Sequence, residues 1–193
     1  MPHVQIVAIG CSTGGPSALM KILPKLHGLV NTPILITQHS SGSFTQALAE
    51  QIERASKFPT RVAKTADIIQ PGHIYLAPSD SHLTIKQTIG EIRCYLDHSP
   101  AENYSKPSVN PMLRSVAKIY GRRALAVILT GMGKDGLEGC RSIVEHGGRV
   151  LVQDESTSVV WGMPGAVAQA GLANAKVPLA LIPEAIHRCL KTR

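Results

Sequence analysis

Short apolar runs alternate along the chain with longer stretches in which apolar residues recur at helical spacing. The runs at 4–9, 33–38 and 124–130 are rich in Val, Ile and Leu, and each precedes a polar or glycine-containing turn and a helix-like stretch. Continuous apolar runs of this length are typical of strands that are buried on both faces of a parallel sheet. The pattern therefore predicts repeated β-α units around a parallel sheet.

Residues that favour helix starts support the helical stretches. Ser43, with Gln46 three positions further on, resembles a capping box ahead of a helix over 47–52. Pro16 suits the first turn of the helix after the first strand, because its fixed φ matches helical backbone.

Three short segments with alternating apolar and polar residues interrupt this rhythm. They lie at 73–77, 82–86 and 91–96 and are separated by Pro-Ser-Asp-Ser and by Thr-Ile-Gly. Alternation bounded by turn residues predicts antiparallel strands. We therefore expect an α/β fold with a mostly parallel sheet and an antiparallel hairpin or meander at one edge.

Length and composition indicate one ordinary domain over residues 1–193. The 193 residues are 44% hydrophobic and 17% charged, which excludes a disordered, collagen-like or coiled-coil chain. No apolar run approaches the ~20 residues of a membrane span, and the first residues lack the layout of a signal peptide. We therefore expect a cytoplasmic protein that does not insert into a membrane.

The chain carries a formal net charge of +7, from 20 Lys and Arg against 13 Asp and Glu. This surplus either favours an anionic partner surface or is only a solvated basic surface. Aromatic residues make up only 4%, and no Lys/Arg run is interleaved with them. The sequence therefore predicts no nucleic-acid partner.

Side chains that directly follow parallel strands are candidates for chemistry, because ligands bind outside the carboxyl ends of such strands. The first strand runs into I-G-C-S-T-G-G-P at 9–16. Such a turn exposes backbone N–H groups at a helix start and favours a phosphate or a developing oxyanion. The motif lacks the Lys of a Walker A loop and has Ser12 where a dinucleotide fingerprint needs Gly. Ser12 is then either a nucleophile or a cap of the helix.

The four cysteines are predicted to be reduced and mostly buried. They lie far apart without C-x-x-C spacing, which argues against a zinc knuckle, a thioredoxin-like site and a secreted disulfide framework. Cys11 precedes Ser12 and could be a nucleophile at a helix start. We expect it instead to point into the sheet packing. The four are Cys11, Cys94, Cys140 and Cys189.

His39 follows the second apolar run and is the second candidate. A neutral imidazole within ~3 Å of a serine hydroxyl can accept its proton and pass it to a leaving group. The alternative is a strand-end histidine that makes only a structural hydrogen bond.

The third apolar run leads into L-T-G-M-G-K-D-G-L-E-G at 129–139. Asp135 could orient an imidazole, or it could form an N-cap pair with Glu138. The surrounding glycines permit close backbone approach, so amides near Met132 and Gly133 could face a substrate oxygen. Three strands that end in Ser, His and Asp at one edge of the sheet favour a serine hydrolase triad.

Five motifs, taken in order, resemble the catalytic domain of chemotaxis protein-glutamate methylesterases, the CheB family. They are I-G-C-S-T-G-G-P, I-T-Q-H followed by F-T-Q-A-L-A-E, P-G-H-I-Y-L-A-P-S-D-S-H, K-P-S-V-N and L-T-G-M-G-K-D-G. The later V-Q-D-E-S-T-S-V-V-W-G-M-P is also similar, so the resemblance covers nearly the whole chain. It implies a three-layer, doubly wound α/β sheet with a hairpin at one edge.

The resemblance also implies roles for individual residues. Ser12 matches the family's nucleophile, His39 its general base and Asp135 the carboxylate that orients the histidine. Thr13 and Met132 match positions beside the reacting carbonyl, whose backbone N–H groups would bind the oxyanion. The implied reaction is hydrolysis of glutamate γ-methyl esters on cytoplasmic helices of chemoreceptors, often with deamidation of glutamines there. It proceeds through an acyl-enzyme and needs no metal or other cofactor.

The chain departs from the family pattern in three respects. Ser40 and Ser41 replace the Met-Pro that commonly follows the histidine, and Lys134 replaces a common Asn before the aspartate. Lys134 either keeps Asp135 ionised or points to solvent. The family's N-terminal receiver domain has no counterpart in this sequence. We therefore expect a single catalytic domain, with a separate receiver protein as a candidate partner.

Two other functions stay open at this point. One is a serine acyl hydrolase for a different ester or amide, because the departures fall where a substrate would make contact. The other is a non-enzymatic phosphate- or nucleotide-binding module that uses the loop at 10–15, although this loop lacks a Walker lysine.

Overall fold

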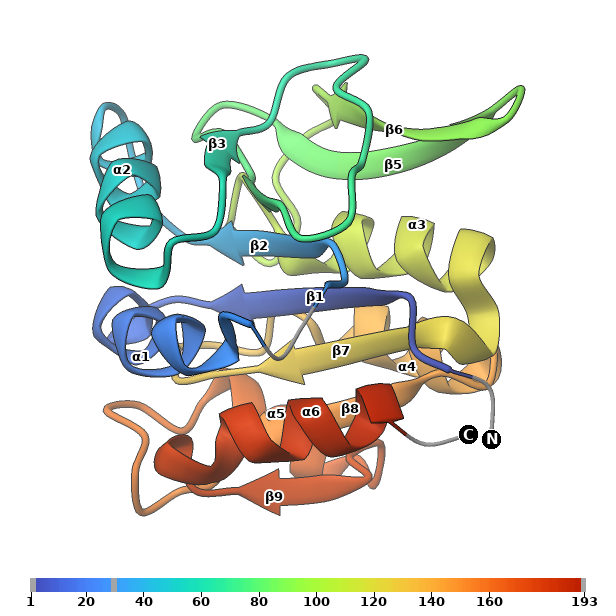
Figure 1. The fold of residues 1–193 in the computed structure, drawn as a ribbon. Coiled ribbons are helices and arrows are strands. Elements are labelled where there is room, and N and C mark those ends of the chain that lie inside the picture. The colour runs from blue at the N-terminus through green and yellow to red at the C-terminus, as the bar shows by residue number, and fades with distance from the viewer. Residues whose placement is uncertain (1–2, 29–30, 192–193) are drawn as a thin grey trace.

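The computed structural model describes residues 3–28 and 31–191 and contains a seven-stranded sheet with helices on both faces (Figure 1). The strands are β1 (Ile6–Cys11), β2 (Ile34–Gln38), β3 (Thr60–Val62), β4 (Ile74–Leu76), β7 (Ala124–Ile128), β8 (Arg149–Gln153) and β9 (Ala175–Val177). Their order is β3-β4-β2-β1-β7-β8-β9, and every neighbouring pair is parallel. The predicted doubly wound α/β fold is confirmed.

The helices form the two outer layers of the described chain. On one face lie α1 (Gly15–Ile22), α2 (Phe44–Ser56) and α6 (Ile182–Lys191), and on the other α3 (Val109–Tyr120), α4 (Leu137–Glu145) and α5 (Met163–Gln169). Short 3-10 turns are η1 (Leu23–Leu26), η2 (Gly121–Arg123) and η3 (Leu179–Leu181). None of the helices in residues 3–28 and 31–191 is long and apolar enough to span a bilayer.

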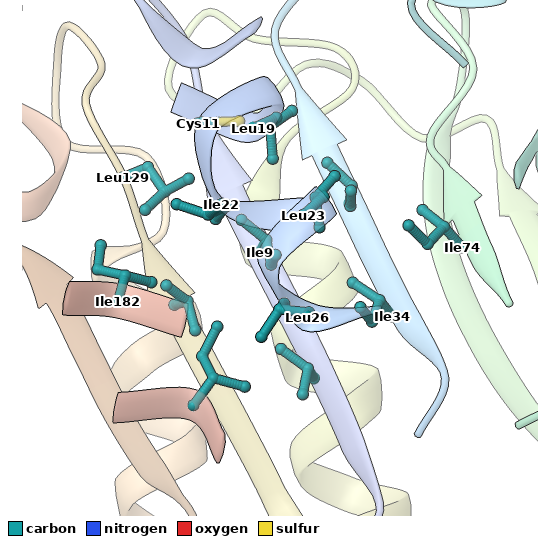
Figure 2. Packing of buried hydrophobic residues seen from close by; sticks show 14 of the residues in the cluster. Ile9, Cys11, Leu19, Ile22, Leu23, Leu26, Ile34, Ile74, Leu129 and Ile182 are labelled. Atoms are coloured by element: carbon teal, nitrogen blue, oxygen red, sulfur yellow. The ribbon is translucent and has the colours of Figure 1, made fainter. Parts of the chain in front are cut away.

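The strands divide their side chains between two hydrophobic cores. All six residues of β1 are buried, with Ile9 and Cys11 facing α1 and with Ile6 and Ala8 facing α3. Figure 2 shows the first of these cores, in which Leu19 of α1 lies beside the Cys11 side chain. Burial on both faces explains why these strands are continuous apolar runs in the sequence.

The connections change face at the centre of the sheet. The chain leaves β1 through α1 on one face, and it leaves β7 through α4 on the other (Figure 1). The carboxyl ends of β1 and β7 therefore form a topological switch point, and ligands of open α/β sheets bind at such points. Both Ser12 and the glycine-rich turn after β7 lie at this edge.

The predicted hairpin exists, but it contains two strands rather than three. β5 (His82–Thr88) and β6 (Glu91–Asp97) form a separate antiparallel sheet that packs on α3. The assignment of 73–77 to this antiparallel set is wrong, because β4 lies between β2 and β3 in the parallel sheet. Tyr75 gave the segment its alternating appearance. Its ring is buried, and its hydroxyl donates to the Ile68 carbonyl at 2.8 Å.

The helix starts agree with the sequence in one case and differ in the other. Pro16 lies in the first turn of α1 as predicted. Ser43 is at the N-cap of α2, but its backbone is helical (φ −70°, ψ −9°) and its side chain makes no capping bond. A cap needs extended backbone to aim the side chain at the helix amides. The predicted capping box is therefore wrong, and Gln46 donates instead to Glu50 on the exposed face.

Candidate active site

Ser12 lies in a tight turn between β1 and α1. Its backbone N–H donates to the Thr130 carbonyl at 3.0 Å, and its own carbonyl accepts from Gly15 at 2.8 Å. Gly14, the residue before the helix, has φ +80°, a conformation that favours glycine. The turn thereby places Ser12, which is half-buried, at the edge of the sheet. The N-cap residue of α1 is Gly14 and not Ser12.

His39 lies beside Ser12 because β1 and β2 are in register. Cys11 pairs with Gln38 at the ends of the two strands, so the next residue of each strand is Ser12 or His39. The backbone N–H of His39 donates to the Cys11 carbonyl at 3.1 Å, which continues the β1–β2 hydrogen bonding by one residue. No hydrogen bond joins the Ser12 hydroxyl to the imidazole in the described structure. Catalytic contacts of this kind often tighten only when substrate binds.

The imidazole of His39 contacts Asp135 directly. Its Nε2 lies 2.6 Å from Oδ2 of the carboxylate, and the side chains are 17% and 2% exposed. An ionised carboxylate accepts from Nε2–H, so the other ring nitrogen, Nδ1, carries the free lone pair in the neutral imidazole. The Ser105 hydroxyl lies 3.4 Å from Nδ1. This serine was not among the site residues predicted from the sequence.

The side chain of Asp135 lies at the N-terminus of α3. It does not form an N-cap pair with Glu138 at the start of α4, the helix that follows it in the chain. Its carboxylate accepts from the Ser108 hydroxyl at 2.7 Å, the Val109 amide at 2.8 Å and the Gly136 amide at 2.9 Å. The N-terminal end of α3 also favours a negative charge. The N-cap interpretation is therefore wrong, because the side chain reaches across to a different helix.

The same contacts set the protonation state of Asp135. Burial by itself would raise the pKa of this carboxyl, since it disfavours the charged form. The hydrogen bonds from His39, Val109 and Ser108 outweigh burial, and the pKa of Asp135 lies below its usual value. The carboxylate is therefore charged at neutral pH and can stabilise a positive imidazole.

The turn after β7 packs directly against Ser12. A side chain on Gly131 would lie 2.9 Å from Ser12 Cβ and 3.0 Å from its nitrogen. Met132 is 71% exposed, and Gly133 has φ +85° with open space on its side-chain face. Among the backbone hydrogen bonds of turns and loops in residues 3–28 and 31–191, none is donated by the Thr13 or the Met132 amide. The oxyanion role that the family resemblance implies for these two amides stays a prediction.

Cys11 is part of the core, as its position before Ser12 predicts. Its side chain is fully buried beside Leu19 (Figure 2). Burial raises the pKa of the Cys11 thiol well above its usual value, so the thiolate that nucleophilic attack requires is suppressed. Cys94 and Cys140 are also buried and free, and Cys189 is partly buried.

The residues that depart from the family pattern lie around the site. Lys134 is exposed and forms no ion pair with Asp135, which favours its solvent-facing interpretation. The Ser40 hydroxyl lies 2.9 Å from that of Thr45 and so joins the His39 loop to the first turn of α2. Ser41 is exposed.

Three polar residues that were not predicted from the sequence contact the candidate triad. Ser105 faces His39, Ser108 donates to Asp135, and Gln38 bonds to both strand ends. Ser108 precedes a helical stretch, which is a sequence signal for a cap. The Ser105–His39 and Gln38–Ser12 contacts run between segments distant in the sequence and leave no such signal. No group of three or more His, Cys, Asp or Glu within residues 3–28 and 31–191 is placed to bind a metal.

Comparison with known proteins identifies the family. The model of the CheB methylesterase family matches residues 7–186. This chain belongs to the CheB methylesterase family. The crystal structure of the Thermotoga maritima CheB methylesterase catalytic domain is 38% identical and superimposes with a TM-score of 0.93 over 97% of this chain and 99% of that one. The resemblance inferred from the motifs is confirmed.

Two relatives of this chain are named for an enzymatic activity. The protein-glutamate methylesterase/protein-glutamine glutaminase of Azospirillum brasilense is 49% identical over 91% of this chain and 45% of its own length. The protein of the same name from Trichodesmium erythraeum is 46% identical over 96% of this chain and 53% of its own length. The chain thus spans about half the length of the relatives that it matches.

Proposed function

We propose that this protein is a serine hydrolase that removes methyl esters from glutamate side chains of chemoreceptors and also deamidates glutamines there. One observation carries the proposal: the 2.6 Å contact between His39 Nε2 and Asp135 Oδ2, one strand away from Ser12. An imidazole held by a buried carboxylate is arranged to accept a proton. The relatives' name, protein-glutamate methylesterase/protein-glutamine glutaminase, supports the choice of substrate.

The first half of the reaction forms an acyl-enzyme. Ser12 Oγ attacks the γ-carbonyl carbon while its proton passes to Nδ1 of His39, the nitrogen that does not face Asp135. The negative oxygen of the tetrahedral intermediate accepts hydrogen bonds from the Thr13 and Met132 amides, with Gly133 giving the turn its backbone freedom. The C–O bond to the methoxy group then breaks, and His39 returns the proton to the departing methanol.

The second half of the reaction releases the receptor segment with a free glutamate side chain. Water attacks the glutamyl ester of Ser12, and His39 takes the proton of the water and passes it to Ser12 Oγ. For a glutamine substrate, ammonia leaves in place of methanol and the same acyl-enzyme follows. Asp135 stays ionised throughout and stabilises the imidazolium that forms in each half, because five donors already support its charge.

The proposed partners are methylated segments of chemoreceptors. These segments lie on the cytoplasmic side of the receptors, and we propose the same location for this protein. A macromolecular substrate agrees with the exposed position of Met132 and the surface-facing Ser12 turn, which leave the catalytic edge open to a broad partner.

The test is incubation with receptor membranes that carry labelled methyl esters. Ser12→Ala and His39→Ala are each expected to lower methanol release by several orders of magnitude, because nucleophile and base act as one unit. Ser17→Ala, an exposed serine on α1, is the matched control and should release methanol at the wild-type rate. Release by Ser12→Ala at the wild-type rate would contradict the proposal. If the wild-type protein released no methanol from receptor membranes but hydrolysed other esters, this would favour a serine acyl hydrolase with a different substrate.

A further inference from the structure

Gln38 is the last residue of β2, and its side chain crosses to the end of β1. Its Nε2 donates to the Ser12 carbonyl at 3.1 Å and to the His39 carbonyl at 2.8 Å. The residue is only 6% exposed. One amide group therefore bonds at the same time to the residues proposed as nucleophile and base.

The orientation of this amide follows from its neighbours. If nitrogen and oxygen were exchanged, the amide oxygen would face two carbonyl oxygens, all of them acceptors. In the observed orientation Oε1 is buried and has no hydrogen-bond partner. A buried acceptor without a partner is unfavourable and needs a compensating reason. Both protons of Gln38 are thus used at the Ser12 and His39 backbones while its oxygen stays unsatisfied.

Gly15 provides the space for this arrangement. A Cβ atom on Gly15 would lie only 2.0 Å from Gln38 Oε1 and 3.0 Å from the Cys11 side chain. The Gly15 amide also donates to the Ser12 carbonyl, so that carbonyl accepts from the helix start and from β2. The Gly15 position therefore requires glycine because the Gln38 amide occupies the place of a side chain.

We propose that Gln38 is a positioning residue that fixes the distance and orientation between Ser12 and His39. The inference rests on the proposed function and adds to it a residue that touches neither substrate nor reacting atoms. The Ser12 and His39 side chains project from neighbouring strand ends, and no hydrogen bond joins these two side chains to each other in the described structure. A misplacement of about 1 Å between reacting groups can cost about 100-fold in rate. The Gln38 amide restricts this movement by tying both backbones to one rigid plane.

A second strand-terminal glutamine provides a contrast. Gln153 ends β8, and its Oε1 accepts from the Thr130 amide at 2.8 Å while its Nε2 donates to the Thr157 carbonyl at 2.7 Å. Both ends of that amide are paired, as expected for a structural role. Of these two buried glutamines in the described chain, Gln38 is the one whose oxygen has no hydrogen-bond partner.

The experiment compares Gln38→Met with wild type and with Asn174→Ala. Methionine keeps the length and apolar volume of the side chain but donates no hydrogen bond. The control removes an amide that accepts from the Val150 N–H at 2.7 Å, at the start of β8 and away from the catalytic edge. The readouts are the thermal midpoint, kcat and KM on a small neutral ester, and the rate at which a fluorophosphonate labels Ser12.

For Gln38→Met we expect kcat and the labelling rate to fall at least tenfold while KM changes less than twofold. Asn174→Ala is expected to lower the thermal midpoint without lowering either rate in the folded protein. Rates of Gln38→Met within twofold of wild type would overturn the proposal. The proposal would also be overturned if Asn174→Ala, at the same drop in thermal midpoint, lost as much kcat and labelling rate as Gln38→Met.

Gln38→Glu adds a test in which the labelling rate is measured as a function of pH. A purely structural role of Gln38 does not predict the pH dependence described here. Its carboxylate would face two carbonyl oxygens and repel them, whereas the protonated acid can donate one hydrogen bond. The labelling rate of Gln38→Glu relative to wild type should therefore rise as pH falls. A ratio independent of pH would overturn the proposal.

The two proposals fail in different ways. If Ser12 is labelled in wild type but receptor membranes release no methanol, the substrate assignment is wrong and the labelling rates still test Gln38. If methanol release depends on Ser12 and Gln38→Met labels at the wild-type rate, the proposed function stands and the role of Gln38 is wrong.

Discussion

At the scale of single residues, Asp135 carries a charge in an almost fully buried position. Five donors support it, from the imidazole of His39, the hydroxyl of Ser108 and three backbone amides. Hydrogen bonds to a charged group are stronger than those between neutral groups. The arrangement lowers the pKa of Asp135 although burial opposes ionisation.

This lowered pKa predicts how stability depends on pH. The contribution of Asp135 is present above its ordinary value of 3.8 and is lost as pH falls through the lower value of the folded state. Asp135→Asn should therefore destabilise the protein at pH 7, by about 1–3 kcal/mol for donors left unsatisfied, and by less at pH 3. Urea unfolding of both proteins at the two pH values measures this. An equal difference at both would contradict the assignment.

Cys11 and Ser12 are neighbours with opposite surroundings, and this predicts different effects of substitution. Cys11→Ala should keep most of the catalytic activity, because its side chain lies in the core and its thiol pKa is raised by burial. Removal of one buried sulfur should lower the free energy of unfolding by about 1–2 kcal/mol. Ester hydrolysis and urea unfolding check the two parts. Loss of turnover in folded Cys11→Ala would reverse the assignment of the nucleophile.

At the scale of elements, the active edge depends on close packing between the β1–α1 turn and the turn after β7. Gly131 lies at this contact, and its carbonyl accepts from Gly162 and Met163 at the start of α5. Three turns, after β1, after β7 and before α5, are thereby packed around one glycine. Such crowding transmits small shifts to the catalytic groups because close-packed interiors yield little.

Gly131→Ala is therefore expected to lower both stability and kcat. Its new Cβ would lie 2.4 Å from Met163 Sδ and 2.9 Å from Ser12 Cβ, and overpacking of this kind costs about 1–3 kcal/mol. Gly148→Ala is the matched control, because its Cβ would lie 2.8 Å from Ile143 at the opposite edge of the sheet. Both variants should melt at a lower temperature. Equal kcat values for the two folded variants would contradict a specific effect on Ser12.

At the scale of the whole molecule, the net charge of +7 acts over distances longer than any single contact. The ion pairs in the described chain involve arginines and His39 but no lysine, so much of the positive charge is free to act on solvent and partners. A protein with this surplus attracts an anionic partner surface and binds it faster at low ionic strength.

The specificity constant on receptor membranes should therefore fall as salt rises from low to physiological concentration, where the Debye length is about 8 Å. Hydrolysis of a small neutral ester should change little over the same range, because it has no long-range attraction to lose. Parallel measurements on the two substrates test this. An equal salt dependence would show that the basic surplus does not assist docking.

The sequence by itself determined the fold class and the candidate residues. The runs at 4–9, 33–38 and 124–130 correspond to β1, β2 and β7 within two residues at each end, because strands buried on both faces must be continuously apolar. Ser12, His39 and Asp135 could be selected because each follows such a strand, and parallel strands bring their carboxyl ends to one edge. The family motifs lie in these same turns, where local spacing records the chemistry.

Only the tertiary structure decided which groups meet across that edge. Three of the five donors to Asp135 come from the N-terminus of α3, whose first residue lies 26 positions before the aspartate, and Gln38 reaches Ser12 over a separation of 26 residues. The place of β4 in the parallel sheet likewise depends on its neighbours β2 and β3 rather than on its own three residues. Hydrophobic periodicity reports which face of an element is buried. Hydrogen bonds between distant segments depend on strand order and register, which a local pattern does not contain.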